Sequence, residues 1–440
     1  MAETTGSGNA GQPAASEHSN HAAEPQQPDR RQLLQRGVVG SAGLLLTGGA
    51  GAEGSGPATA PTAPAADQGA PQVRSYRRLG RTGLKIADIS FGSSRLRTGD
   101  EHLVHHALDR GVNYFDTAES YGRGVSETVL GRALKGRRDE VILATKMHCG
   151  PTTSQATMMR ELEGSLRRLQ TDRVEIYFNH AVNSIDRLEN DEWYEFLSRA
   201  KQQGKLRFNG ISGHAGRLIP VIEHAVDNDL IDVVLAAYNF GQDPAFYEGL
   251  TRSFDFVATQ PDLPRVLQKA RAKDVGVIAM KTLMGARLND LRHYEQAGNT
   301  FAQAAFRWTL SSPLVSALVV SMTGTDVIDE YLGASGAETL AAHDLDLLQS
   351  YAARNGLSYC KHACDQCESS CPYGVQIADV LRTRMYATDY RDLPFARTEY
   401  AALATNAEAC LGCDGSPCRD ACPHGIDTAT LCAPTHRLLA

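Results

Sequence analysis

Four side chains with complementary acid–base chemistry lie near the ends of three consecutive apolar runs: Asp116, Tyr121, Lys146 and His180. A tyrosine with an ordinary pKa of about 10 is a poor proton donor at neutral pH. A lysine ammonium beside it would stabilise the phenolate and lower the tyrosine pKa, and an aspartate would keep the lysine charged and oriented. A histidine can donate a hydrogen bond to a carbonyl oxygen. The set predicts a site that protonates a carbonyl oxygen while hydride reaches the carbonyl carbon.

The elements that must hold these side chains follow from the pattern of residues 73–342. Short apolar, β-branched runs alternate there with stretches of helical periodicity, which predicts an α/β fold, a (β/α)8 TIM barrel. A doubly wound open sheet is the alternative, but no G-x-G-x-x-G follows the first run. The predicted strands are 87–92, 113–116, 141–146, 174–180, 208–212, 233–239, 277–281 and 317–321.

In such a barrel, chemistry collects at the carboxyl ends of the strands, where the four side chains lie. Each one alone also fits a structural role, such as a loop cap, a surface tyrosine or half of an ion pair. Their joint occurrence at three consecutive strand ends favours catalysis. Among the helices, leucines recur at helical spacing in 154–169, and Ser154 is expected to be the N-cap.

Residues 113–122, which read NYFDTAESYG, resemble the signature of the aldo-keto reductase superfamily. The opening 76–84 resembles the N-terminal hairpin and first strand of that family, and the resemblance covers roughly residues 75–340. It implies the barrel fold, a nicotinamide cofactor and a small aldehyde, ketone or alcohol as substrate. By this resemblance Tyr121 is the general acid/base, which Lys146 and Asp116 tune, and His180 orients the carbonyl.

The cofactor region matches the family less closely. Ser212 fits the residue that grips the carboxamide, but Gly213 and Leu235 stand where the family usually has Asn and Gln. The loop 321–325 offers hydroxyls and backbone to a phosphate, without the nearby Arg that usually selects a 2′-phosphate. We expect NADP(H), with NAD(H) as the alternative. The predicted cofactor-binding residues are Ser212, Asn239, Lys281, Ser321 and Thr323.

Cysteines are concentrated at the end of the chain. Of the ten, only Cys149 precedes residue 360, which excludes a disulfide framework spread over the whole protein. Residues 360–372 read C-x3-C-x2-C-x3-C-P, and residues 410–423 read C-x2-C-x4-C-x3-C-P. The two runs resemble the bacterial two-[4Fe–4S] ferredoxin module, which predicts a small ferredoxin-like iron–sulfur domain over 343–440.

That resemblance assigns the fourth cysteine of each run to the other cluster. One cluster would use Cys360, Cys364, Cys367 and Cys422, and the other Cys410, Cys413, Cys418 and Cys371. One extra residue precedes Cys364 and two precede Cys418, while Cys149 and Cys432 are left over. Zinc sites and disulfides are the alternatives. The clusters could serve a redox partner protein, a substrate radical or structure alone.

Residues 1–72 form a leader and an Ala/Pro/Gly-rich linker. The pair Arg30-Arg31, with two leucines and the short apolar run 38–52 behind it, resembles a twin-arginine export signal. It predicts a protein of the periplasm or cell envelope. The alternative is an arginine pair in a disordered leader of a cytoplasmic protein.

Charge and hydropathy narrow the class of protein further. The 44 basic and 51 acidic side chains give a net charge of −7, which argues against a nucleic-acid binder. No apolar stretch reaches the ~18 residues of a membrane span. The leading hypothesis is therefore a carbonyl reductase. The alternatives are an iron–sulfur electron-transfer protein on the same scaffold with a decayed nicotinamide site, and a regulatory subunit.

Overall fold

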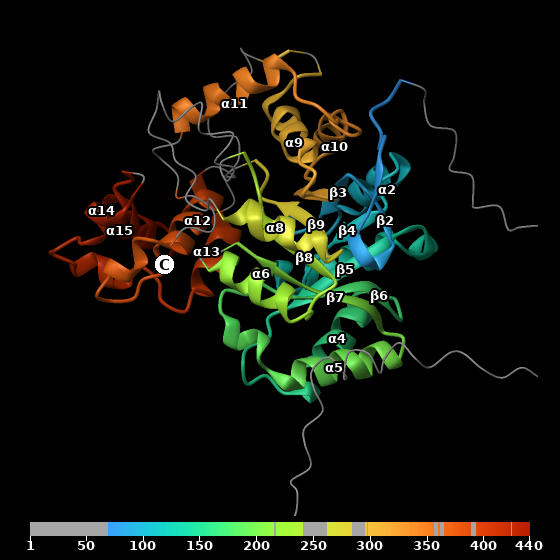
Figure 1. The fold of residues 1–440 in the computed structure, drawn as a ribbon, viewed down its shortest axis with the longest axis horizontal. Coiled ribbons are helices and arrows are strands. Elements are labelled where there is room, and N and C mark those ends of the chain that lie inside the picture. The colour runs from blue at the N-terminus through green and yellow to red at the C-terminus, as the bar shows by residue number, and fades with distance from the viewer. Residues whose placement is uncertain are drawn as a thin grey trace, which may run out of the picture.

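The computed structural model describes residues 69–214, 217–240, 262–283, 295–296, 298–355, 360, 365–388, 393–423 and 425–440. Within them, parallel strands close into a barrel in the order β10-β3-β4-β5-β6-β7-β8-β9 (Figure 1), which confirms the predicted fold. The twin-arginine segment and Cys364 lie outside the described residues. The barrel strands are β3 (Ile89–Gly92), β4 (Tyr114–Asp116), β5 (Ile142–Met147), β6 (Val174–Asn179), β7 (Leu206–Gly213), β8 (Val233–Ala237), β9 (Gly276–Met280) and β10 (Ala317–Ser321).

Helices surround the barrel and bury their apolar faces on the strands. In α4, Leu162, Leu166 and Leu169 are buried, and the Ser154 hydroxyl accepts a hydrogen bond from the Thr157 amide, as predicted for an N-cap. The helices of this layer are α2 (Glu101–Asp109), α3 (Val125–Ala133), α4 (Gln155–Leu169), α5 (Asp191–Gln202), α6 (Leu218–Asp227), α8 (Leu263–Ala272), α9 (Phe301–Ser311) and α10 (Thr325–Leu332).

The first predicted strand is divided in the structure. Ala87 belongs to β2 (Lys85–Ala87), which pairs antiparallel with β1 (Tyr76–Arg78) in a hairpin, and the first barrel strand β3 follows it. The chain turns between them at Asp88, whose carboxylate accepts hydrogen bonds from the Ser335 hydroxyl and the Gly336 amide at 2.6 and 2.7 Å. The 87–92 run is thus one apolar segment used in two elements.

The hairpin closes the amino end of the barrel, because Leu79 packs into the barrel interior. Beside it, Gly80 has a φ of 47°, and a Cβ atom there would collide with the backbone nitrogen of Gly276. This close approach requires glycine.

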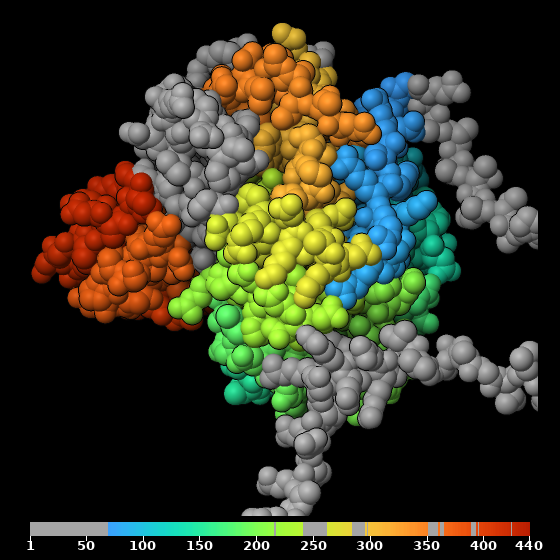
Figure 2. Space-filling view, in the orientation of Figure 1, coloured from blue at the N-terminus to red at the C-terminus, as the bar shows by residue number. Residues whose placement is uncertain are grey.

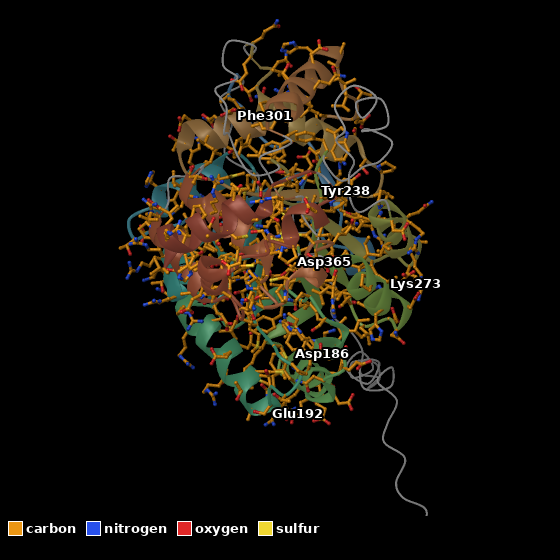
Figure 3. The ribbon with its side chains drawn as sticks, turned by 90° about the vertical axis from the view of Figure 1, so that its left-hand side faces the viewer. Asp186, Glu192, Tyr238, Lys273, Phe301 and Asp365 are labelled. Atoms are coloured by element: carbon orange, nitrogen blue, oxygen red, sulfur yellow. The ribbon has the colours of Figure 1, made fainter. Side chains whose placement is uncertain are left out.

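The C-terminal region is helical in its described residues: α11 (Ala342–Asn355), α12 (Ile377–Thr388), α13 (Leu393–Ala401), α14 (Cys418–Ala421) and α15 (Thr428–Leu439). The α11 helix packs against α9, where Arg307 and the buried Asp344 form an ion pair at 2.7 Å. The later helices share a separate core that includes Cys367, Val380 and Tyr400. Figure 2 shows them as a lobe beside the barrel, and Figure 3, which faces this side, places Asp365 in front of the barrel. No described helix is long and apolar enough for a membrane span.

Candidate active site

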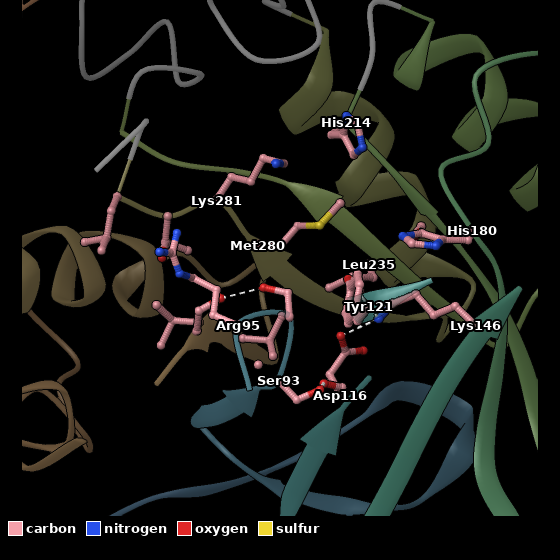
Figure 4. Close-up of a pocket in the computed structure, with 18 of the residues that line it drawn as sticks. Ser93, Arg95, Asp116, Tyr121, Lys146, His180, His214, Leu235, Met280 and Lys281 are labelled. Atoms are coloured by element: carbon pink, nitrogen blue, oxygen red, sulfur yellow. Dashed lines mark hydrogen bonds and ion pairs between the residues drawn. The ribbon is translucent and has the colours of Figure 1, made fainter. Parts of the chain in front are cut away.

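The structure brings the four predicted acid–base residues together at the carboxyl end of the barrel. Asp116 ends β4, Lys146 lies in β5, and His180 directly follows β6. Tyr121 begins the short 3-10 turn η2 (Tyr121–Gly124) in the loop after β4. All four line one cavity of about 170 Å³ (Figure 4), so the sequence prediction of their proximity matches the structure. Their catalytic roles stay predictions.

A buried ion pair directs the lysine towards the tyrosine. The Lys146 ammonium contacts an Asp116 carboxylate oxygen and donates to the Thr117 carbonyl oxygen at 2.7 Å. Its Nζ lies 3.5 Å from the Tyr121 hydroxyl oxygen and 4.9 Å from the centre of the Tyr121 ring. Burial lowers the pKa of Lys146 and raises the pKa of Asp116, and in each case the partner's charge opposes the shift. The ion pair therefore keeps a buried charge next to the phenol.

The pKa of Tyr121 differs from the sequence expectation. Burial raises it well above 10, and the negative charges of Asp116 and Glu399 act in the same direction. The sequence analysis expects Lys146 to lower this pKa, but burial raises it in the structure. Tyr121 is therefore protonated at neutral pH, as a proton donor must be.

His180 is held as a neutral ring facing this phenol. Its ring packs edge-on against Tyr121, with centres 5.7 Å apart, and stacks on His148 at 4.4 Å. Burial, then the nearby His148 and Lys146, lower the pKa of His180 well below 6.5. Its Nδ1 has no hydrogen-bond partner among the described residues. A neutral imidazole can still donate one hydrogen bond, which suits it to a substrate oxygen.

The loop behind His180 is fixed by Arg187, a residue that no sequence motif singles out. Its guanidinium donates to the backbone oxygens of Cys149, Ala181 and His180 at 2.7, 2.7 and 2.8 Å. It also donates to the side-chain oxygen of Asn179 at 2.8 Å. Ala181 has a φ of 51°, an uncommon conformation for alanine. Arg187 thus stabilises the strained turn that aims His180.

Three of the five predicted cofactor residues line the cavity: Ser212, Lys281 and Ser321. The Ser212 hydroxyl accepts from the Ala181 amide at 2.9 Å, and the Ser321 and Ser94 hydroxyls are 2.8 Å apart. Leu235 lines the cavity where the family resemblance has Gln. The other two residues, Asn239 and Thr323, are not among those lining it.

Each of these two has a clear position. Asn239 is buried and donates to the Lys281 carbonyl oxygen at 3.1 Å. Thr323 is exposed in the loop that leads into the amino end of α10. A helix amino end with free backbone amides suits a phosphate group, so the hydroxyls and this loop fit a nicotinamide dinucleotide.

Two residues of the C-terminal region, missed by the sequence analysis, also line the cavity: Tyr386 of α12 and Glu399 of α13. The Lys281 ammonium donates to the Tyr386 hydroxyl at 3.0 Å. Arg382 of α12 donates to the His214 carbonyl oxygen at 3.2 Å. The cysteine-rich region therefore forms part of the cavity wall, and no local sequence signal indicates this.

Of the predicted cysteine ligands that the structure describes, five belong to the C-terminal core: Cys360, Cys367, Cys371, Cys410 and Cys418. Cys367, Cys418 and Cys432 are buried there, and the Cys432 thiol, which the ligand assignment leaves over, hydrogen-bonds Cys410. Among the described residues, which exclude Cys364, no group of three or more His, Cys, Asp or Glu is arranged to hold a metal ion. The thiol chemistry suits iron–sulfur ligation, and the two ligand sets stay a prediction.

Comparison with known proteins gives consistent matches over the barrel. The model of the aldo/keto reductase family matches residues 89–353. L-galactose dehydrogenase of Arabidopsis thaliana is 28% identical over 59% of this chain and 87% of its own length. L-glyceraldehyde 3-phosphate reductase of Escherichia coli is 25% identical over 66% of this chain and 96% of its own. The solved structure of the aldo-keto reductase AKR11C1 from Bacillus halodurans, 23% identical, covers 63% of this chain and 95% of its own, with a TM-score of 0.50.

Proposed function

Because the chain belongs to the aldo/keto reductase family, we propose that it interconverts a small aldehyde or ketone with its alcohol, using NADP(H), or NAD(H) as the alternative. The observation that carries the proposal is the common cavity of Asp116, Tyr121, Lys146 and His180. An enzyme with this arrangement can supply a proton where a carbonyl gains a hydride.

A bound nicotinamide would supply the hydride. Tyr121, which is protonated, donates its hydroxyl proton to the carbonyl oxygen as negative charge develops there. Lys146 stabilises the phenolate that remains, because its ammonium is already directed at the hydroxyl by Asp116. Neutral His180 donates a hydrogen bond to the same oxygen and orients it. In the alcohol-oxidising direction the phenolate takes the proton back.

Ser212 and Ser321 would hold the cofactor by their hydroxyls, and the loop containing Thr323 would receive a phosphate at the amino end of α10. Asn239 would act through Lys281, whose carbonyl oxygen it binds. These assignments are supported by where the hydroxyls and the helix end lie.

Steady-state consumption of NADPH and NADH with a panel of aldehydes tests the proposed activity. Tyr121→Phe should lower kcat by about 10²–10⁴-fold, the usual contribution of a general acid. A circular dichroism melt of the variant checks that it folds. Turnover that survives this substitution would exclude Tyr121 as the proton donor.

We also propose that the cysteine-rich region carries two [4Fe–4S] clusters, which serve electron transfer to a redox partner protein or structure. The gathering of five of the predicted cysteine ligands in one core supports it. If the nicotinamide site has decayed, as Leu235 and Gly213 suggest, the protein is instead an electron carrier on this scaffold. Cluster absorption without any nicotinamide turnover would favour that second function.

Export by the twin-arginine route is proposed from Arg30-Arg31. Fractionation of cells expressing the full chain should find the protein in the periplasm or envelope. The double substitution Arg30→Lys, Arg31→Lys should retain it in the cytoplasm. If the wild type and the double variant are found in the same cell fractions, export by this route is contradicted.

A further inference from the structure

A second cavity, of about 150 Å³, lies outside the proposed active site and is lined by three arginines: Arg123, Arg132 and Arg168. These arginines come from the turn η2 and from the helices α3 and α4. The other described residues that line the cavity carry no charge: Thr98, Gly124, Val125, Thr128 and Val129. Three separate elements therefore bring a guanidinium side chain to one small space.

Carboxylates pair with only two of these three guanidinium groups. The Arg168 Nε donates to the buried Glu127 carboxylate at 2.6 Å, and the Arg132 Nη1 lies 3.7 Å from a Glu101 carboxylate oxygen. The exposed Arg123 guanidinium has no hydrogen bond or ion pair within the described part of the chain. Because a guanidinium carries five N–H donors, all three arginines keep donors for a ligand.

The second cavity shares the turn η2 with the proposed active site. Tyr121 lines the active-site cavity, whereas Arg123 and Gly124 line the second cavity. Three successive residues of this turn, Gly122, Arg123 and Gly124, have φ values of 58°, 55° and 88°. Glycine adopts such values readily, but an arginine in this conformation is strained, and strained residues gather at ligand sites. The backbone that presents Tyr121 to the active site thus also presents Arg123 to the second cavity.

Gly124 allows the Arg168 side chain to lie against this turn, because a Cβ atom at position 124 would be 2.6 Å from the Arg168 Cδ. The Arg168 Nη2 also donates to the Ser165 hydroxyl at 3.2 Å, in addition to the ion pair with Glu127. Arg168 is therefore a positioned cation in the cavity wall. Arg123 and Arg132 are exposed, so their side chains are free to turn towards a ligand.

Guanidinium groups select oxyanions, because their planar forks match pairs of oxygens in carboxylate and phosphate groups. A carboxylate offers two oxygens in one plane. A phosphate group offers oxygens in tetrahedral directions, so it is able to accept hydrogen bonds from several guanidinium groups at once. A neutral ligand would leave the charge of Arg123 without a counter-charge. A phosphate group is therefore the chemistry that fits this cavity.

We propose that Arg123, Arg132 and Arg168 bind a phosphate group, either as free phosphate or as part of a small phosphate monoester. This site is separate from the amino end of α10, where the cofactor phosphate is proposed to lie. A phosphate held by these arginines connects the turn η2 to α3 and α4. Its binding therefore restricts the motion of the turn that carries Tyr121.

Calorimetric titration of the full chain with inorganic phosphate and with glycerol 3-phosphate, at an ionic strength kept constant with NaCl, tests the site. Arg123→Gln and Arg132→Gln each remove charged hydrogen bonds and should weaken the binding of both probes by about tenfold. The matched control is Arg167→Gln, an exposed arginine on α4 that does not line the cavity, and it should bind as the wild type does. Tighter binding of glycerol 3-phosphate identifies the ligand as a monoester, and equal binding identifies it as free phosphate; the site stands in both cases.

Hydrogen exchange locates the bound phosphate without any need for turnover. Backbone amides of residues 121–129 should exchange more slowly when phosphate is added to the wild type or to Arg167→Gln, and should show no slowing in Arg123→Gln. If the folded Arg123→Gln and Arg132→Gln variants, verified by circular dichroism, keep wild-type affinity, the proposal is overturned. Weaker binding by Thr323→Ala would then place the phosphate at the cofactor loop. A wild-type protein that binds neither probe would overturn the proposal as well.

Discussion

At the scale of single residues, burial determines the protonation states of the side chains that line the catalytic cavity. The same desolvation that keeps Tyr121 protonated also keeps His180 neutral and makes the Lys146–Asp116 pair interdependent. A hydrogen-bond donor set of this kind needs no rearrangement when a carbonyl oxygen arrives. The arrangement requires a buried ammonium, that of Lys146, which the Asp116 carboxylate stabilises.

Asp116→Asn tests that dependence. It leaves the Lys146 ammonium buried without its carboxylate, so the free energy of unfolding should fall by about 3–5 kcal/mol. Urea denaturation measures the loss. Lys146→Met in the same background should restore part of the stability, because no buried charge then remains. An Asp116→Asn variant as stable as the wild type would contradict the buried pair.

Lys281 predicts a pH dependence of stability. Burial, then the positive charge of Arg382, lower its pKa to about 7 in the folded protein, against about 10.4 when unfolded. Between these values the unfolded chain binds more protons, so the free energy of unfolding should rise with pH through this window. Below pH 7 the cost of holding the partly buried Lys281 charge is fully present.

The comparison that isolates this effect is Lys281→Met. Urea denaturation of both proteins from pH 6 to about 10.4 should show the wild type gaining stability relative to the variant as pH rises. Parallel pH profiles would mean that Lys281 titrates at its ordinary pKa.

The residue types of the carbonyl site were predictable, because Asp116, Tyr121, Lys146 and His180 stand at strand ends that a barrel must bring to one rim. The direction of the Tyr121 pKa shift was not, since it depends on how much water the cavity excludes. It also depends on the negative charge of Glu399, which comes from the C-terminal region.

At the scale of elements, the turn after β6 is the most constrained part of the site. Arg187 donates hydrogen bonds to the carbonyl oxygens of His180 and of the strained Ala181. Its positive charge also helps to lower the pKa of His180. Arg187 is thus a positioning residue for His180.

Arg187→Met should lower the free energy of unfolding by about 2 kcal/mol or more, because it leaves several oxygens unpaired. It should also raise the pKa of His180, since one nearby cation is gone. Proton NMR titration of His180 measures the second effect, which loss of stability alone would not produce. A His180 titration identical to that of the wild type would limit Arg187 to a structural role.

The strand pattern predicted the barrel elements to within a few residues, since alternation and β-branched runs record local burial. It failed where one apolar run served two elements, at Ala87 and Ile89. The strand pattern could not place α12 and α13 over the cavity. The contact between Lys281 and Tyr386 joins residues 105 positions apart in the sequence, and neither residue belongs to a recognisable motif.

At the scale of the whole molecule, the cysteine-rich region has two separate relations to the barrel. Its core gathers the thiols, and its helices α12 and α13 complete the cavity. The repeat of Cys-Pro runs predicted the first relation, and only the three-dimensional structure reveals the second.

An anaerobic preparation of the full chain should contain about eight iron and about eight sulfide per chain if two [4Fe–4S] clusters assemble. Cys367→Ser should lower the iron content, whereas Cys149→Ser, buried at the barrel, should not. Elemental analysis and visible absorption measure both. A colourless protein containing zinc would exclude iron–sulfur clusters.

The α12 helix places Val380 in the C-terminal core and Tyr386 at the cavity. On the ribosome the barrel strands emerge first and this helix much later, and domains generally fold as they emerge. The nascent barrel therefore has its acid–base residues before it has its full cavity wall. The active site is therefore complete only after the C-terminal core has folded and has placed α12 against the barrel.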